Sequence, residues 1–410
     1  MNPAEVYPHR KCPICGDLGA ELLLEQRFSL LEGAALLAGY NVVTCKSCGG
    51  VFSDHLPDSK KFAKYYASAS KYEFSHRGGQ QHSEEINRVD GLAKWLAGHI
   101  PKGCSILDVG CATGELLIRL RSEGFTDITG LDPSHECTKR ARTLHGLSMI
   151  RGVLGARKRT HRTYGAVILS AVLEHIPDIN TFFKSLKSWM APKGFLVIEV
   201  PDLEFFKNSK NAPFQELSVE HVNFFTAASL KNLLGAFGFK VVRKRNFICA
   251  AAPGGITGAV LTMVGQLKGS SKTPKLERTS RSAMKDYIRI SRKTLKEERK
   301  VIRNIVGNGR PILVWGTGTL CQRLLAQGEL VKDNIISFVD SNPHYKGKML
   351  AGVPIISPEQ IRSNAPILIA SWGFQDEIST TIKKHLRLKN KIITLRKVHN
   401  KARLNRKEKN

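Results

Sequence analysis

The sequence has no apolar run long enough to cross a membrane. Its most apolar stretch, residues 247–265, is interrupted by Pro253 and by three glycines, so we expect no transmembrane segment. The first residues also lack the apolar core of a signal peptide, which favours a cytoplasmic protein. Cysteines are odd in number, at nine, and four of them lie in two Cys-x-x-Cys pairs. This pattern argues against a disulfide framework and for a reducing compartment.

Acidic residues are scarce, since 35 Asp and Glu stand against 63 Lys and Arg, for a net charge of +28. The excess is concentrated in two segments: residues 268–303 carry a net +9 and residues 383–410 a net +11. The basicity therefore belongs mainly to a linker helix and a tail, which favours solvated surface. An acidic partner such as phosphate, nucleic acid or anionic lipid is the alternative for these segments.

The 410 residues suit two or three domains, and the pattern of apolar runs divides them. Residues 85–245 alternate helical patterns with the β-rich runs SILDV, DITGLD, GAVILS, GFLVIEV and KVVRKRNFI, which predicts a doubly wound α/β sheet. A second α/β alternation begins at Pro311. The predicted segments are a cysteine-bearing domain 1–70, a central α/β domain 71–265, a basic linker and helix 266–306, a C-terminal Rossmann-like α/β domain 307–400 and a disordered basic tail 401–410.

Within the linker, an amphipathic helix is predicted by the spacing of its apolar residues. They recur on one helical face, and Lys and Arg populate the other: the apolar positions are Met284, Ile288, Leu295 and Ile302.

The two cysteine pairs, CPIC and CKSC, have the spacing of a metal site. Two residues between thiolates let one tight turn aim both sulfurs at a single ion, and a glycine follows each pair. Four thiolates leave no open coordination position, so a structural zinc ion is predicted on Cys12, Cys15, Cys45 and Cys48. A redox or metal-free pair of turns is the alternative. The other five cysteines are interpreted as packing residues.

The segment SILDVGCATGELL places a predicted strand, residues 106–109, directly before a glycine-rich turn and a helix. Gly110 and Gly114 let the backbone pass close to a ligand, and Asp108 stands at the end of the strand. Asp132 ends the next strand, where an acid can accept hydrogen bonds from the hydroxyls of a ribose.

The stretch 105–200, with LDVGCATG and LSAVLEHIPD, resembles class I S-adenosylmethionine (SAM)-dependent methyltransferases. The resemblance implies that Asp108, Gly110 and Gly114 contact the methionine part of SAM. It also implies that Asp132 binds the ribose and that the backbone near Ser170 binds the amino group. A dinucleotide-binding Rossmann fold and an inactive methyltransferase domain are the alternatives.

Glu220 and His221 follow the fifth predicted strand of the central domain, in FQELSVEHVNFF. Ligands bind beyond the carboxyl ends of such strands, so His221 is placed to act as a general base. The alternative is a histidine that caps the helix starting near Thr226.

The whole chain resembles the deoxysugar C-methyltransferases, which combine a zinc-binding, a SAM-binding and a Rossmann-like domain and act on nucleotide-linked 4-keto sugars. The segments that carry the likeness in the last domain are VWGTGTLCQRLL, FVDSNPHYKGKMLAGVPI and ASWGFQDEI. The resemblance implies that His221 is the base, supported by Glu220 and His175. Two departures stand out: Ser218 occupies the position of a family tyrosine, and the family's substrate strand is reduced to PGGI, residues 253–256.

The last domain has its own glycine-rich turn, Gly316-Thr317-Gly318, with Asp340 at the end of the next strand. Taken alone this pattern predicts a second nucleotide site. The resemblance favours instead a module that helps to bind the nucleotide of the substrate.

The predicted function is a cytoplasmic, zinc-containing, SAM-dependent methyltransferase that C-methylates a nucleotide-linked deoxysugar, with a small-molecule rather than a nucleic-acid partner. Sugar O-methylation and RNA methylation are the enzymatic alternatives. The sequence LEHIPD, standing where RNA base methyltransferases have their catalytic motif, argues against the second. A zinc-bearing scaffold with an inactive methyltransferase domain is the non-enzymatic alternative.

Overall fold

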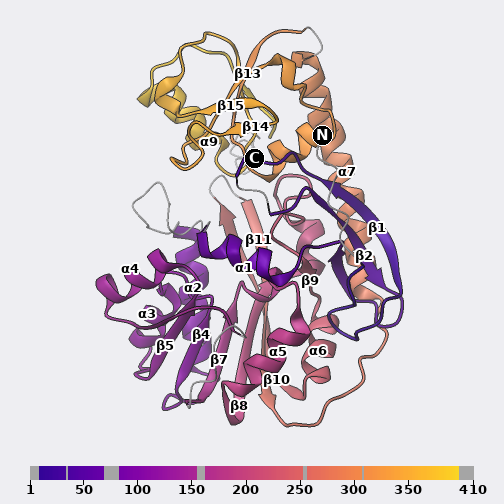
Figure 1. Cartoon of the computed structure of the whole chain (residues 1–410), viewed down its shortest axis with the longest axis vertical. Helices are drawn as coiled ribbons and strands as arrows, with labels where there is room; N and C mark the ends of the chain where they lie inside the picture. The colour runs from indigo at the N-terminus through magenta and orange to yellow at the C-terminus, as the bar shows by residue number, and fades with distance from the viewer. Residues whose placement is uncertain are drawn as a thin grey trace, which may run out of the picture.

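The computed structural model describes residues 9–33, 36–68, 83–154, 162–252, 256–306 and 309–396, and within them the strands form three sheets. Figure 1 shows the C-terminal sheet above the central sheet, with β1 and β2 running along one side next to α7. No helix in these residues is long and apolar enough to cross a membrane. Residues 401–410 and Pro253, Gly254 and Gly255, on which the predicted tail and substrate strand fall, lie outside the described part.

The central sheet has the strand order β10-β11-β8-β7-β4-β5-β6. The strands β8, β7, β4, β5 and β6 are parallel, and β11 and β10 extend the sheet antiparallel beyond β8. This arrangement confirms the predicted doubly wound sheet, to which the structure adds the unpredicted β6 and β11. The strands are β4 Ile106–Val109, β5 Ile128–Asp132, β6 Ser148–Arg151, β7 Tyr164–Ser170, β8 Met190–Pro201, β10 Phe239–Ala252 and β11 Ile256–Leu267.

Alternation along the strands builds a core on each face of the central sheet. Val167 and Leu169 of β7 face one core, whereas Ala166 and Ile168 face the other, as the two-residue period of a strand requires. The helices α5 Ile179–Ser188 and α6 Ala227–Ala236 supply the first core. The second core is covered by α2 Ser83–Ala97, α3 Glu115–Ser122 and α4 His135–His145.

The N-terminal sheet is completed by a strand from the central segment. Its order is β1-β2-β3-β9, formed by β1 Ala20–Arg27, β2 Gly39–Cys45, β3 Val51–Asp54 and β9 Asn223–Phe224. In the antiparallel β3–β9 pair, Val51 lies opposite Phe224 and Phe52 opposite Asn223. The strand that follows Glu220 and His221 is therefore held by the N-terminal segment. The helix α1 Ser59–Ser68 leads from this sheet to the central domain.

The C-terminal sheet has the order β14-β15-β13-β12-β16-β17 and is parallel except for β14, which confirms a Rossmann-like domain. It is reached through α7 Thr279–Val306, whose predicted apolar residues are at most 5% exposed. The strands and helices are β12 Ile312–Trp315, α8 Thr319–Ala326, β13 Ile335–Val339, β14 Met349–Leu350, β15 Val353–Ile356, β16 Ile367–Ile369, α9 Gln375–Thr380 and β17 Ile392–Thr394.

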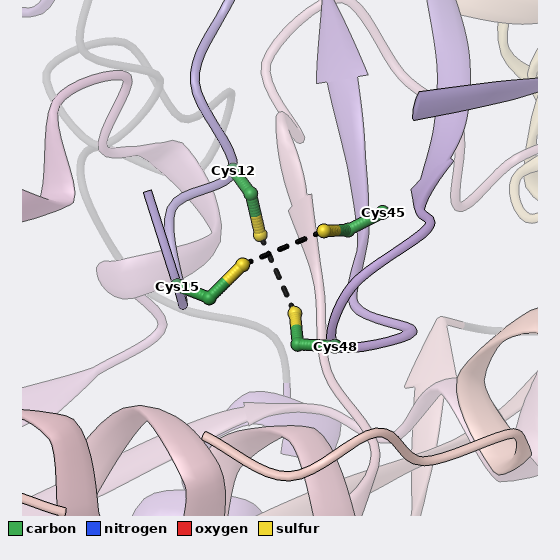
Figure 2. Close-up of side chains that lie close together, drawn as sticks. All are labelled: Cys12, Cys15, Cys45 and Cys48. Carbon is green, nitrogen blue, oxygen red and sulfur yellow. Dashed lines mark hydrogen bonds between the residues drawn. The ribbon is translucent and has the colours of Figure 1, made fainter. Parts of the chain in front are cut away.

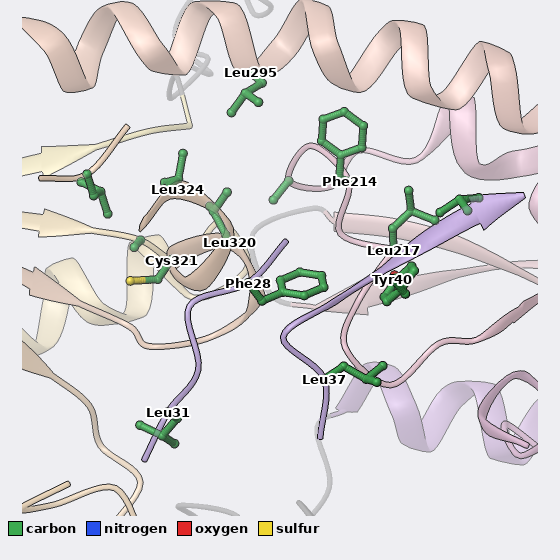
Figure 3. Close-up of a cluster of buried hydrophobic side chains, with 14 of the residues drawn as sticks. Phe28, Leu31, Leu37, Tyr40, Phe214, Leu217, Leu295, Leu320, Cys321 and Leu324 are labelled. Atoms are coloured by element: carbon green, nitrogen blue, oxygen red, sulfur yellow. The ribbon is translucent and has the colours of Figure 1, made fainter. Parts of the chain in front are cut away.

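One hydrophobic core joins all three segments (Figure 3). Phe28 and Tyr40 come from the N-terminal segment, Phe214 and Leu217 from the central segment, and Leu324 from α8. A core shared in this way buries apolar surface that each segment would otherwise expose, so the three parts support one another's folding.

Four cysteine sulfurs converge beside the N-terminal sheet (Figure 2). The Sγ atoms of Cys12 and Cys48 lie 3.5 Å apart, as do those of Cys15 and Cys45, and all four lie within 4.8 Å of one another. A tetrahedral ion with zinc–sulfur bonds of about 2.3 Å would hold its sulfurs roughly 3.8 Å apart. The soft thiolate set and this spacing fit the predicted structural zinc.

The glycine that follows each cysteine pair takes a left-handed conformation. Gly16 has φ 81° and Gly49 has φ 80°, values that L residues with side chains rarely adopt. A Cβ atom on Gly49 would lie 1.8 Å from the carbonyl oxygen of Glu277, whose own N–H donates to the carbonyl of Cys48. The second turn of the zinc site thus packs directly against the residues that lead into α7.

Zinc removal is predicted to loosen β9 as well as the N-terminal strands, because the thiolate cluster anchors the sheet in which β9 lies. Chelation should accelerate amide hydrogen exchange in β1, β2, β3 and β9, while β4 and β5 stay protected. Hydrogen-exchange mass spectrometry with and without chelator checks this.

Elemental analysis should find one zinc ion per chain, lost in Cys48→Ser and kept in the control Cys104→Ser, whose thiol is remote from the cluster. Protein purified without chelator and devoid of zinc would contradict the assignment.

Candidate functional site

The glycine-rich loop after β4 has the backbone conformation that its sequence predicts. Gly110 has φ 73° and Gly114 has φ 86°, and Gly114 is the N-cap of α3. A Cβ atom on Gly114 would lie 2.3 Å from Cδ1 of Leu147, so this position has no room for a side chain. Ala112, between them, also lies in the left-handed region, at φ 48°, which costs a residue with a Cβ about 1–2 kcal/mol.

Asp132 ties the loop to the end of the neighbouring strand. Its Oδ2 accepts a 2.9 Å hydrogen bond from the backbone N–H of Ala112, and its Oδ1 accepts one of 2.9 Å from that of Ser134. A carboxylate offers about four lone-pair sites, so the two oxygens can still accept bonds from a ligand. Asp132 and Gly110 both line one cavity within the described residues.

Asp108, Gly114 and Ser170 are not among the residues that line this cavity. The pKa of Asp108 is raised to about 8, mainly by burial and then by the nearby charge of Asp132, against an opposing effect of Arg88. Ser170 ends β7, and its hydroxyl donates to the buried Glu199 carboxylate, which Arg88 also contacts. Arg88 and Glu199 both line the cavity, and their ion pair places buried charges in its wall.

The same cavity is also lined by His175, Glu220 and His221. Its volume is about 570 Å³, within the range of small-molecule sites. Residues that the sequence connected with SAM and residues that it connected with the acceptor therefore share one space. Such an arrangement lets a donor and an acceptor meet without bulk water.

The two histidines are held through Nδ1 by backbone carbonyls. Nδ1 of His221 lies 3.2 Å from the carbonyl oxygen of Glu216, and Nδ1 of His175 lies 3.1 Å from that of Glu220. A carbonyl only accepts, so a neutral His221 ring carries its proton on Nδ1 and its lone pair on Nε2. The rings meet edge to face, with centroids 4.9 Å apart.

Two tyrosines of α1, which the sequence analysis did not single out, complete the site. The hydroxyl of Tyr65 donates to Oε1 of Glu220 at 2.7 Å, and the hydroxyl of Tyr66 lies 3.0 Å from Nδ1 of His175. Burial raises the pKa of both phenols, with a further contribution from the charge of Glu220, so both stay protonated at neutral pH. Phenols therefore stand beside the histidines although Ser218 replaces the family tyrosine.

Ser218 shapes the turn that carries the catalytic candidates. Its hydroxyl oxygen accepts from the backbone N–H groups of Glu220 and His221, and its carbonyl accepts from the hydroxyl of Tyr40. The alternative role of His221 as a helix cap is wrong, because Thr226 itself caps α6 in a reciprocal arrangement with Ser229.

Two further groups of side chains have metal-binding spacing within the described residues. They are His9, Asp54 and His55, and Glu174, His175 and His221, each with ligand atoms within 4.8 Å of one another. The second group coincides with the candidate catalytic residues.

The glycine-rich turn of the C-terminal domain is closed by its own acid. Oδ2 of Asp340 accepts from the backbone N–H of Thr317 at 3.0 Å and from its hydroxyl at 2.7 Å. The link parallels the one that Asp132 makes to Ala112 in the central domain, and it gives the turn a defined shape.

Two protein families match the chain. Residues 80–244 match the methyltransferase domain family, and residues 271–395 match the C-methyltransferase C-terminal domain. The C-methyltransferase NovU of Streptomyces niveus is 25% identical over 378 residues, covering 86% of this chain and 85% of its own.

Other relatives match a smaller share of the chain. The tRNA U34 carboxymethyltransferase of Pseudoalteromonas translucida is 30% identical over 161 residues, covering 37% of this chain and 50% of its own. A crystal structure of magnesium protoporphyrin IX methyltransferase from Synechocystis with bound SAM covers 51% of this chain and 97% of its own, at 20% identity and a TM-score of 0.36. A likeness at that level carries no argument.

The family matches, the full-length relative and the cysteine cluster agree with the resemblance predicted from the sequence. The chain is therefore a SAM-dependent methyltransferase with a zinc-binding N-terminal segment and a C-terminal domain of the C-methyltransferase type.

Proposed function

We propose that the chain transfers a methyl group from SAM to a carbon atom of a nucleotide-linked 4-keto deoxysugar, with His221 as the general base. The observation that carries the proposal is the single cavity lined by both Asp132 and His221. Sequence resemblance supplies the sugar, and the C-methyltransferase C-terminal domain supports carbon as the acceptor atom.

The first step is removal of a proton from the carbon next to the ketone. The C–H bond breaks, the proton goes to Nε2 of His221, and the electron pair is delocalised onto the ketone oxygen as an enolate. The hydrogen bond from Nδ1–H to the Glu216 carbonyl supports this role, because it keeps the lone pair on Nε2 and stabilises the imidazolium that forms.

Stabilisation of the enolate falls to the neighbouring donors. Tyr66 lines the cavity and keeps its proton because burial raises its pKa, whereas Tyr65 donates its only proton to Oε1 of Glu220. Glu220 positions Tyr65, and His175 lies against both Tyr66 and His221. Donors fixed before the reaction are effective because they need no reorganisation as the charge develops.

When bound, SAM supplies an electrophilic methyl group on a sulfonium centre. We place its ribose on Asp132 and its methionine part along the loop from Asp108 to Gly114, with its amino group near the end of β7 at Ser170. Burial raises the pKa of Asp108, and the positive charge of bound SAM would favour its ionised form, whereas Asp132 lines the cavity itself. In the second step, the enolate carbon would take the methyl group as its bond to the sulfonium breaks, and S-adenosylhomocysteine would leave. The residues themselves only bind and orient, so this step is largely a matter of proximity.

The C-terminal domain is proposed to help hold the nucleotide of the substrate. Tyr345 of this domain packs against the same hydrophobic core as Tyr65 and Tyr66 of α1, and burial raises its pKa, with smaller contributions from the charges of Asp340 and Glu220. RNA as the acceptor is less well supported, because the tRNA-modifying relative matches only 37% of this chain and 50% of its own length.

Asp132→Ala is predicted to weaken SAM binding about ten- to a hundredfold, because hydrogen bonds to a charged group contribute roughly 1.5–3 kcal/mol. Titration calorimetry measures the dissociation constant. Glu136→Ala, on the exposed face of α4, is the matched control and should bind as the parent does. An unchanged constant in Asp132→Ala would place the cofactor elsewhere.

His221→Asn is predicted to keep the fold and the affinity for SAM while losing roughly 10²–10⁴-fold in rate, the usual contribution of a positioned base. Without SAM, the parent should exchange deuterium into the carbon α to the ketone, and the variant should not. His135→Asn, an exposed histidine on α4, is the control. Because O-methylation requires no carbon-bound proton to leave, absence of exchange in the active parent would favour the O-methyltransferase alternative.

A further inference from the structure

Arg323 is a fully buried arginine at the junction of all three segments. It lies on α8 with 1% of its surface exposed. Its Nε donates to Oε1 of Gln26 on β1 at 3.1 Å. Its two terminal nitrogens donate to three carbonyl oxygens of the central segment: Pro213 at 3.2 Å, Phe214 at 3.0 Å and Leu217 at 2.8 Å. One side chain thus links three parts of the protein.

The guanidinium is held by carbonyls and rings rather than by a counter-ion. The rings of Phe28 and Phe214 each have their centroid 5.4 Å from Cζ of Arg323. Among the described residues, no carboxylate forms an ion pair with it, and burial lowers its pKa against the opposing effects of Tyr40, Tyr287 and Glu298. An arginine keeps its charge even so, and its five donors match a cluster of buried carbonyl oxygens.

The carbonyls that Arg323 binds belong to the segment that positions His221. Phe214 has φ 58°, a left-handed conformation that costs free energy and needs outside support. Between Phe214 and Leu217 lies Glu216, whose carbonyl accepts from Nδ1 of His221. The Glu216 N–H donates to the hydroxyl of Tyr287 on α7, at 3.0 Å. The position of this carbonyl is therefore set by α7 and α8, outside the central domain.

We propose that Arg323 is a positioning residue for His221. By holding residues 213–217, it keeps the Glu216 carbonyl where it fixes the Nδ1–H tautomer of His221, so the C-terminal domain controls which nitrogen of the base faces the acceptor. The proposal rests on the proposed function for the role of His221 as base, but the tautomer it concerns can be measured without activity.

Removal of the guanidinium would take one donor from each of the carbonyls of Pro213, Phe214 and Leu217, of which Phe214 keeps the N–H of Leu217 as a partner, and would release the strain at Phe214. The segment would then relax, and the Glu216 carbonyl would move relative to the imidazole. A displacement of about 1 Å in a catalytic group can cost about 10²-fold in rate. The contacts of SAM with Asp132 and Gly110 lie on other elements and would be unaffected.

The test compares Arg323→Met, Arg323→Lys and Tyr287→Phe with the parent, in protein carrying ¹⁵N-labelled histidine. The His221 signals are assigned by their absence in His221→Asn. In the parent, the neutral ring should show a protonated Nδ1. In Arg323→Met, the Nε2–H tautomer should become populated, and kcat should fall about 10²-fold while the dissociation constant for SAM stays within twofold.

The other variants guard against a purely structural effect. Arg323→Lys keeps the charge but lacks the planar fork, so it should fold with the tautomer still disturbed. Tyr287→Phe removes the hydroxyl on α7 that accepts from the Glu216 N–H, and it should shift the His221 signal in the same direction. This variant keeps the proposal testable if Arg323→Met fails to fold. Leu324→Ala is the matched control, because it opens a cavity in the same core on the same helix and should leave the His221 tautomer unchanged.

A parent-like His221 tautomer in both Arg323→Lys and Tyr287→Phe, with kcat within twofold of the parent, would overturn the proposal. An identical tautomer change in Leu324→Ala would also overturn it, by showing that general loosening of the core is sufficient. Full activity in His221→Asn would defeat the base mechanism alone, since the tautomer measurement would still report whether Arg323 positions the ring.

Discussion

The structure depends on how the backbone of residues 211–224 is satisfied. This segment carries the candidate base but contains only the two-residue strand β9, so its polar groups need partners from elsewhere. The N-terminal sheet pairs with β9, α7 supplies hydroxyls, and α8 supplies Arg323. Because every neighbour contributes, the conformation of the segment is determined only when all three parts of the chain are assembled.

The zinc site contributes to the same segment through Arg10, two residues before Cys12. The guanidinium of Arg10 donates to the carbonyl oxygens of Val222 and Ile176 and to Oδ1 of Asn223. Thiolate coordination would fix the turn from Cys12 to Cys15, and Arg10 extends from beside it to the residues just after His175 and His221. A structural metal remote from the reaction can therefore influence catalysis through the placement of backbone.

The replacement of a family tyrosine by Ser218 illustrates how a site can keep its chemistry while its residues change position. Ser218 orders the turn through its hydroxyl, and Tyr65 and Tyr66 bring phenols to Glu220 and His175 from α1. Tyr65 and Tyr66 thus supply the phenols near the histidines, although Ser218 departs from the family pattern. The adjacent tyrosines gave no sequence signal, because α1 is separated from residue 220 by more than 150 positions and nothing in their spacing points there.

Local patterns were sufficient for the features that depend on neighbours in the chain. The Cys-x-x-Cys spacing, the glycines after β4, the acid at the end of β5 and the apolar face of α7 each follow from short-range geometry, which is why the sequence alone predicted the zinc cluster, the cofactor loop and the linker helix. The tertiary structure decided what distance along the chain conceals. It brought Tyr65 to Glu220, turned the Glu216 carbonyl toward His221 and buried Arg323 beneath that turn. These contacts join residues tens to hundreds of positions apart, or depend on which way one carbonyl points, and no periodicity or local propensity encodes either property.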